Sequence, residues 1–488
     1  MQNTNNSKCQ HIVIYGDGLA AQMTAAALAM QAPPQIKITW IGSGKTSPED
    51  IFYGGVTTPA AYDFNLAAGV AEPEVVLESD TAFSYGTRYS HWGLAKWSWI
   101  QSFHVPFPVI DGVLFNHYLS QQSIYELEPF LTSAVAAKNG AFAHPPEGGG
   151  SALSRAEYGY QFDSATYGAL FEKSAGKNGV KKIVSEISRI ESEFTGISSI
   201  VLADGQTLTA DLYIDCSGPQ ALLLSSLKVS FQKGRRIAAI AEVKAAAGPG
   251  APVRTISGNQ LGWNAETPLQ NGVALMSVFD SESQDDIQSD LSKIEVTLGC
   301  REVAWSGNCV AIGQAAGVLE PLTPAPMVLL QRDIERLLSL LPITQEMSVE
   351  RREFNRLYAD DFEHADLFNR SLFEGPDFPD TPYWRAARQL PADEKLTNKI
   401  AQFESRGLHV AYDLEPFNQE DWTIMHYGMA RRPARYDRIA DQASPVKVGA
   451  YLANMRREID ETVKAMPSHK VYMEGLTRFL KQQNGLKP

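Results

Sequence analysis

Two glycines near the N-terminus, Gly16 and Gly18, are spaced as in a turn that brings the backbone close to a bound phosphate. Glycine suits such a turn because it adopts positive φ and lets a ligand approach the main chain closely. The free N–H groups of a following helix would attract the anion. Ala21 takes the third glycine position, so the pattern predicts either a dinucleotide site or a turn that only packs a helix on a strand.

A strand, a helix and a second strand must position this turn. Residues 11–16 read as an apolar strand, residues 20–31 as an Ala-rich helix and residues 36–42 as another strand, which together predict a βαβ unit. Gly42 stands where an acid would bind the ribose hydroxyls of a nucleotide. The missing charge-assisted hydrogen bond is worth roughly 1.5–3 kcal/mol, which modestly favours a protein that does not turn over a nucleotide cofactor.

Two later segments are similar to parts of flavoprotein monooxygenases. The first is a strand that ends in Asp215-Cys216-Ser217-Gly218, which in those proteins returns near the nucleotide. The second runs through Gly313, Ala316 and Gly317. In those proteins the corresponding segment places a helix N-terminus beside the pyrimidine edge of the flavin ring, where reduced flavin is anionic. Three such segments in this order favour FAD over a packing turn.

The remaining pattern changes from strands to helices. Short strands with turns are expected over residues 179–218 and 235–315, and the helical period begins after Pro342. A Pro/Gly-rich stretch at 144–154 is expected to be a mobile loop. We therefore predict an α/β protein with an FAD/NAD(P)-binding Rossmann-like flavoprotein monooxygenase fold, a β-rich substrate part and a C-terminal helical cover. The expected division is residues 1–345 for the first two and 346–488 for the cover.

Composition restricts the class of partner. Charged residues make up 20% of the 488 residues and the formal net charge is −13, which disfavours nucleic acid and anionic membrane surfaces. The N-terminus is polar and no apolar run is long enough for a membrane span, so a cytoplasmic location is expected. The four cysteines lack CxxC spacing and no histidine pair has the spacing of a metal site, so buried thiols and no metal are expected.

Much of the chain resembles the flavin-dependent tryptophan halogenases. The resemblance is carried by segments at 53–59, 82–92, 158–171, 211–223, 262–270, 308–322, 380–386 and 466–469. It implies FAD as cofactor, with Gly54 in the first of these segments near it, and reduced flavin that a separate flavin reductase supplies. It also implies an aromatic, indole-like substrate, either a small molecule or a tryptophan carried by a peptide.

The halogenating residues of that family are replaced. Its catalytic lysine corresponds to Ser84 and its catalytic glutamate to Thr323. Serine has no amine to direct an oxidised halogen, and threonine has no carboxylate to take a proton near neutral pH. The pair whose backbone N–H groups hold halide reads Ala325-Pro326, and proline has no N–H. With Pro324 nearby, the loop is expected to be extended.

The family's WxWxIP signature, which separates flavin from substrate, reads Trp263-Asn264-Ala265-Glu266-Thr267-Pro268 here. An alanine in place of the second tryptophan would open volume between the two sites unless another group fills it. This suggests direct oxygen transfer from flavin, that is, a monooxygenase. Glu320, in a segment expected near flavin, could carry a proton, although capping a turn is the more common use of such a residue.

Several other side chains leave two interpretations open. Arg88 and His91 could face the pocket or the surface, and the aromatic residues Trp92, Trp97 and Trp99 could stack on an indole or fill the core. Two functions follow from these observations. One is an FAD-dependent oxidoreductase that uses O2 on an aromatic substrate, and the other is a non-catalytic protein of the same fold that binds flavin or an aromatic ligand.

Overall fold

The six-stranded sheet at one end of the molecule confirms the predicted βαβ unit. The structure, a computed structural model, describes residues 8–93, 97–193, 195–282, 290–375, 377–483 and 485. The sheet has the strand order β19 (Trp305–Ser306), β20 (Cys309–Ala311), β13 (Leu212–Asp215), β1 (His11–Tyr15), β2 (Lys37–Gly42) and β9 (Lys181–Val184). All pairings are parallel except β19 with β20. The carboxyl ends of β1, β13 and β20 therefore meet at one edge, which brings together the segments at 16–18, 215–218 and 313–317.

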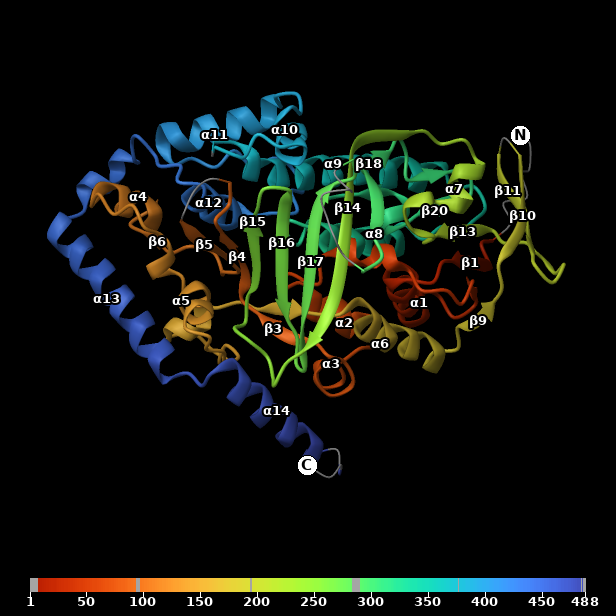
Figure 1. Cartoon of the computed structure of the whole chain (residues 1–488), viewed down its shortest axis with the longest axis horizontal. Helices are drawn as coiled ribbons and strands as arrows, with labels where there is room; N and C mark the ends of the chain where they lie inside the picture. Colours follow the sequence, from red (N-terminus) through yellow and green to blue (C-terminus); the bar gives the residue numbers. More distant parts are fainter. Residues whose placement is uncertain are drawn as a thin grey trace.

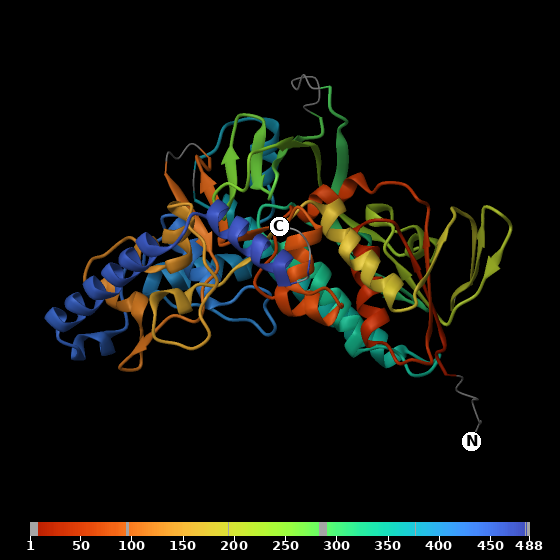
Figure 2. The same ribbon diagram turned by 90° about the horizontal axis from the view of Figure 1, so that it is seen from below.

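Helix α1 (Leu19–Gln31) joins β1 to β2 and is buried on nearly every side. Its alanines allow neighbouring elements to approach closely, so it packs against α6 (Ser164–Lys177) and α8 (Ala325–Ser339). A three-stranded sheet extends from the edge beyond β9, as Figures 1 and 2 both show, and it consists of β10 (Ile187–Glu193), β11 (Gly196–Leu202) and β12 (Thr207–Leu208).

The second large sheet occupies the centre of the molecule (Figure 1). Its order is β21 (Gly317–Val318), β18 (Ile294–Arg301), β14 (Phe231–Ala245), β17 (Gly272–Asp280), β16 (Gly262–Pro268), β15 (Arg254–Gly258), β4 (Gly86–Ser90) and β5 (Ser98–Ser102). Only β15 and β4 pair in parallel. Because β21 follows the turn at residues 313–317 directly, this sheet is joined to the six-stranded sheet through that turn.

The C-terminal third is helical, as predicted from its period. Its helices are α9 (Ser348–Arg370), α10 (Pro382–Arg388), α11 (Glu394–Arg406), α12 (Gln419–Gly428), α13 (Pro445–Ala465) and α14 (His469–Gln483). Figure 1 shows α13 along the outer flank, beside α4 (Phe115–Gln121) and α5 (Thr132–Lys138), and α14 at the lower edge of the molecule. Smaller elements are α2 (Ala61–Ala67), α3 (Glu72–Glu78), β3 (Ala82–Ser84), β6 (Val109–Ile110), β7 (Val113–Leu114) and β8 (Gly159–Gln161). Helix α7 (Leu222–Ser226) packs on β13 and β20 of the six-stranded sheet.

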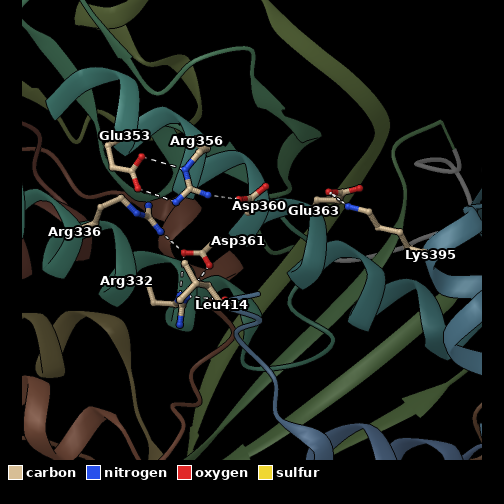
Figure 3. A network of polar contacts seen from close by, with 9 residues as sticks. All are labelled: Arg332, Arg336, Glu353, Arg356, Asp360, Asp361, Glu363, Lys395 and Leu414. Carbon is tan, nitrogen blue, oxygen red and sulfur yellow. Dashed lines mark hydrogen bonds and ion pairs between the residues drawn. The ribbon is translucent and has the colours of Figure 1, made fainter. Parts of the chain in front are cut away.

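A charged network fixes α8 against α9 (Figure 3). Arg336 of α8 bridges the carboxylates of Asp333, at 2.9 Å, and Asp361 of α9, and all three side chains are at most 6% exposed. Arg332 adds a bidentate pair to Asp361 at 2.7 and 2.9 Å. At the outer end of the network, Arg356 pairs with exposed acids of its own helix.

Candidate functional site

The first glycine turn has the geometry that its sequence predicts. Gly16 has φ +150°, and a Cβ there would lie 2.2 Å from the carbonyl oxygen of Cys216, so only glycine fits against the end of β13. Ala21 is fully buried in the first turn of α1. The structure therefore confirms a tight strand-to-helix turn at this edge of the sheet.

A carboxylate lies at the N-terminus of α1. The Leu19 N–H donates to Oδ2 of Asp50 at 2.8 Å, and a Cβ on Gly18 would lie 2.5 Å from that same oxygen. Gly18 thus permits the close approach of a side chain of this protein, in the place where the sequence predicts a phosphate. The positive end of the helix stabilises the anion, while burial raises the pKa of Asp50 to about 7.

Gly42 has a structural explanation. A Cβ there would lie 2.5 Å from Oδ1 of Asp17, so the Asp17 carboxylate fills the space beside the end of β2. That carboxylate accepts hydrogen bonds from the N–H and hydroxyl of Ser43 and from the N–H of Gly44, at 2.7 to 2.9 Å. The Asp17 carboxylate therefore lies where a side chain at the end of β2 would be, and it is hydrogen-bonded to the backbone N–H groups of Ser43 and Gly44.

The cavity next to this turn is small and acidic. It has a volume of about 220 Å³, and its lining includes the carboxylates of Asp17, Glu49 and Asp50. Lys45 also lines it but forms an ion pair with Glu186. Three carboxylates around a cavity disfavour a ligand that carries phosphate groups.

Asp215 holds the start of a helix. Its fully buried carboxylate accepts the N–H groups of Leu223 and Leu224, both at 2.8 Å, and the hydroxyl of Ser217 at 2.6 Å. Burial raises the pKa of this group. Gly218 has φ +73°, and no atom lies within 4 Å of the place where its Cβ would be. The backbone conformation, rather than lack of space, therefore favours glycine here. The predicted cofactor residue Asp215 is thus a cap for α7.

The second turn, at Gly313, also has internal partners for its N–H groups. Gly313 has φ +64°, and its N–H donates to Oδ2 of Asp333 at 3.3 Å. The next N–H, of Gln314, donates to the hydroxyl of Tyr53 at 3.3 Å. Burial raises the pKa of Asp333 to about 6 and that of Tyr53 well above its usual range. The donors that would face the flavin pyrimidine edge are therefore bonded within the chain.

Aromatic side chains fill the space beside this second turn. A Cβ on Gly317 would lie 2.5 Å from the Phe362 ring and 2.9 Å from the Tyr358 hydroxyl, which donates to the carbonyl of Ala316 at 2.7 Å. The cavity that remains here, also lined by Phe52, has a volume of about 10 Å³. A water molecule needs about 10–15 Å³ on this measure, so the space is far too small for a flavin ring.

Ser84 lies on β3 and is fully buried. Its hydroxyl lies 3.2 Å from both the N–H and the carbonyl oxygen of Gly86, and the strand pairs with β8 at Gly159. Within the described residues no hydrogen bond joins Ser84 to Thr323. The Ser84 hydroxyl thus forms hydrogen bonds only with the backbone of Gly86 among the described residues.

Thr323 is also fully buried. Its hydroxyl donates to Oδ1 of Asn369 at 2.6 Å, and the Asn369 amide donates to the carbonyl of Glu320 at 2.8 Å. The next two carbonyls of this loop accept from Arg254 at 2.8 Å, at Pro321, and from Tyr89 at 2.7 Å, at Leu322. Buried side chains therefore hold the loop at every residue from 320 to 323.

The expectation of an extended loop at the two prolines is wrong. Pro324 precedes α8 with φ −66° and ψ 2°, and Pro326 lies in the first turn of that helix. Proline is favourable in the first turn because the N–H it lacks has no helical partner there, and its fixed φ is already helical. The prediction failed because it considered the restriction that proline imposes on its neighbour and omitted this preference.

Glu320 is neither a free proton carrier nor a turn cap. Its Oε1 accepts the indole N–H of Trp263 at 2.8 Å and the hydroxyl of Tyr383 at 2.6 Å. Its Oε2 pairs with Arg235, which also lies over the Tyr383 ring. The carboxylate is 4% exposed, so its charge is balanced by buried donors. It fixes Trp263, the retained signature tryptophan, in the core.

The rest of the signature strand is packed in the sheet. Ala265 is 3% exposed, between Ile256 of β15 and Met276 of β17 in the strand register. Pro268 ends β16, and a Cβ on Gly250 would lie 3.4 Å from its ring. Ala265 is therefore an interior position of the central sheet.

The residues with two interpretations separate clearly. His91 is exposed and its ring contacts the Ser90 hydroxyl at 3.0 Å, so it belongs to the surface. Trp92 and Trp99 are buried at 1% and 6% exposure, whereas Trp97 is 42% exposed. Cys9, Cys216 and Cys309 are buried free thiols, as expected, and Cys300 is partly buried.

Trp97 and Trp99 line a pocket away from the glycine turns. Its volume is about 330 Å³, within the range of ligand pockets. The Trp97 indole N–H donates to the carbonyl of Gly428 at 3.0 Å, and Arg432 lies over the ring of Tyr427, the residue before Gly428. The other charged side chains of the lining are Glu126, Glu128 and Lys138.

Sequence patterns missed the side chains that close the glycine turns. These are Asp50, Tyr53, Asp333, Tyr358 and Phe362. The only available signal was the acid-rich stretch Glu49-Asp50 just before the resembling segment at 53–59. In the part of the chain that the structure describes, no group of three His, Cys, Asp or Glu side chains is placed to hold a metal ion, and no helix is long and apolar enough to cross a membrane.

Comparisons with known proteins agree with this architecture. The sequence pattern of the tryptophan halogenase family matches residues 11–445. The 7-chloro-L-tryptophan 6-halogenase of Kutzneria sp. (strain 744) is 22% identical over 513 aligned positions, which cover 95% of this chain and 98% of the relative. The tryptophan 7-halogenase of Lentzea aerocolonigenes is 23% identical over 445, or 82% and 83% of the two chains.

Solved structures give the same result. A flavin-dependent halogenase from Brevundimonas sp. BAL3 superposes with a TM-score of 0.88 at 26% identity, and the match covers 96% of this chain and 99% of the other. For a flavin-dependent halogenase from Xanthomonas campestris the TM-score is 0.86 at 24% identity, with 96% and 98% covered. The fold class predicted from the sequence is confirmed, and the chain belongs to the tryptophan halogenase family.

Proposed function

We propose that this protein does not halogenate and that it is a non-catalytic member of its family, which binds a small aromatic ligand. The observation that supports this most directly is the use of the hydroxyls that replace the catalytic lysine and glutamate. Ser84 and Thr323 are both fully buried and bonded within the chain, Thr323 to Asn369 at 2.6 Å. Groups without an amine or carboxylate, and without an open side, cannot direct an oxidised halogen or remove a ring proton.

FAD, the cofactor that family membership implies, does not fit the residues present. Its pyrophosphate would meet the Asp50 carboxylate at the α1 terminus, and its ring would meet Tyr358 and Phe362 at the second turn. The two cavities have volumes of about 220 and 10 Å³. We therefore derive no chemical step through the cofactor.

The pocket at Trp97 supports an aromatic ligand. Trp97, at 42% exposure, has a ring open to a ligand, whereas Trp99 stacks on Tyr89 and Arg432 lies over Tyr427, so the Trp99 and Tyr427 rings form the buried floor of the pocket. Stacking on Trp97 would contribute about 0.5–1.5 kcal/mol beyond area burial. The pocket lining also carries both signs of charge. Lys138 and Arg432 are the cations, and Glu126 and Glu128 are the anions. An aromatic amino acid, free or at the end of a peptide, carries a ring, an ammonium group or a carboxylate, and this set of side chains is complementary to it.

Titration of the full chain with L-tryptophan tests the proposal, with calorimetry as the readout. We expect binding that Trp97→Ala weakens at least about tenfold, which is about 1.4 kcal/mol. Tyr62→Ala is the matched control, because Tyr62 is 44% exposed on α2 and Trp97 is 42% exposed. No heat with tryptophan, indole or a tryptophan-terminated peptide would refute the ligand assignment. Halogenated product in an assay with flavin reductase, NADH, FAD, O2 and halide would refute the loss of halogenation.

A second candidate is an FAD-dependent monooxygenase, which would receive reduced flavin from a separate reductase. The retained turn at Gly16 and the alanine at position 265 favour it. This function requires FAD uptake and substrate-dependent addition of one oxygen atom, which mass spectrometry detects. Absence of uptake rules it out.

A further inference from the structure

We infer that the protein supplies its own anion and its own aromatic rings at the two segments expected to hold FAD, so that it folds and acts without the cofactor. This inference concerns the cofactor alone and does not depend on the aromatic ligand of the proposed function. Three contacts carry it, namely Asp50 with Leu19, Asp333 with Gly313 and Tyr53 with Gln314. Each occupies an N–H that a cofactor would use.

Asp50 replaces the pyrophosphate at the first turn. Helix N-termini bind anions because their first N–H groups lack helical partners and the helix dipole is positive there. Asp50 meets both conditions from within the chain, at 2.8 Å from the Leu19 nitrogen. A dinucleotide would have to displace it and then lie beside Asp17 and Glu49 in the same cavity. Neighbouring like charges oppose that exchange.

Asp333 and Tyr53 replace the flavin edge at the second turn. The N-terminus at Gly313 and Gln314 would stabilise a reduced, anionic flavin, but its two N–H groups already have an oxygen each at 3.3 Å. Asp333 is in turn held by Arg336 at 2.9 Å, and Arg336 also pairs with Asp361 of α9. Arg336, which Figure 3 shows with Asp361, therefore anchors Asp333 at this turn.

Aromatic side chains fill the space that the flavin ring would need at the second turn. Phe362 and Tyr358 lie within 3 Å of the place where a Gly317 Cβ would be, and the Tyr53 hydroxyl lies 2.5 Å from that of Gly313. All three belong to the buried core, and the cavity left among them has a volume of about 10 Å³. Because Tyr358 and Phe362 come from α9, they cannot leave without disturbing the α8 and α9 pair.

The test compares wild type, Asp50→Ala and the control Asp63→Ala, in which the acid removed is exposed on α2. Purified full-length protein is dialysed against about 100 µM FAD, and bound flavin is measured after denaturation. The melting temperature is measured with and without inorganic pyrophosphate, and with sodium chloride at matched ionic strength. Asp50→Asn, which keeps the side-chain shape, provides a second variant in case Asp50→Ala folds poorly.

We expect no stoichiometric FAD in any of the three proteins, because the second turn stays closed. Pyrophosphate should raise the melting temperature of Asp50→Ala by at least about 1 °C and leave wild type and Asp63→Ala unchanged. Stoichiometric FAD in the wild type would overturn the inference. Equal responses to pyrophosphate in wild type and Asp50→Ala would overturn the assignment of Asp50 as the internal anion. Neither result bears on the tryptophan titration, so the two proposals fail separately.

Discussion

The two glycine turns expected to hold FAD are closed in different ways. At Gly16 and Gly18 a single carboxylate, Asp50, takes the helix terminus, and a cavity of about 220 Å³ remains beside it. At Gly313 an acid, a hydroxyl and two rings fill the space, and about 10 Å³ is left. The first turn is thus closed by charge and the second by packing. One substitution should reopen the first, whereas the second requires changes in the core.

The largest expected effect comes from the support of the second turn. Arg336→Ala leaves Asp333 as a buried charge without its ion-pair partner, whereas Asp361 keeps its bidentate pair with Arg332. Removing one partner of a buried ion pair costs about 3–5 kcal/mol. Urea denaturation should show this loss in the free energy of unfolding. Arg356→Ala, in the exposed part of the network in Figure 3, should leave the urea midpoint unchanged. Similar losses in both variants would mean that the network acts only through helix propensity.

Phe362→Ala tests the packing of the second turn itself. Removal of this ring should lower the free energy of unfolding by about 3 kcal/mol and leave a cavity at Gly317. A crystal structure of the variant would locate the cavity. Phe479→Ala on α14, where the ring is 53% exposed, is the control and should have little effect. A small loss in Phe362→Ala would show that the rings do not determine closure.

The first turn should respond to pH. Burial raises the pKa of Asp50 to about 7, so the native state holds this proton more tightly than the unfolded chain does between about pH 4 and pH 7. Binding of this proton therefore adds to the free energy of unfolding at low pH. That contribution is lost as the pH rises through 7. The stability of wild type relative to Asp50→Asn should therefore rise by about 2–3 kcal/mol between pH 8 and pH 5. A difference that is constant, or that changes in the opposite direction, would contradict the assignment.

The smallest expected effect is that of one hydroxyl at the second turn. Tyr358→Phe removes the hydrogen bond to the Ala316 carbonyl, which also accepts the Arg301 N–H at 2.8 Å. Since that carbonyl keeps one partner, the loss should be about 0.5–1.5 kcal/mol by urea denaturation. A loss as large as that of Phe362→Ala would show that hydrogen bonding, rather than ring packing, closes this turn.

Local patterns in the sequence predicted the scaffold correctly. The apolar run before Gly16 and the Ala-rich run after it gave the first strand and helix, and the 3.6-residue period after Pro342 gave the C-terminal helices. Such patterns succeed because strand alternation, helix period and glycine conformation depend on neighbours a few residues apart. The assignment of the family's catalytic lysine and glutamate to the positions of Ser84 and Thr323 rests on the resembling segments and stays a prediction.

The occupation of the site depended on contacts between distant segments, and only the tertiary structure decided it. Asp50 is 31 residues from the N–H it accepts, Asp333 is 20 from Gly313, and Asn369 is 46 from Thr323. Glu320 has its partners 57 and 63 residues away, which is why its role was misjudged from the sequence. The sequence by itself determined a strand-to-helix turn that can approach a phosphate. Whether that space is free depends on side chains that packing brings to it from elsewhere, and no local pattern records them.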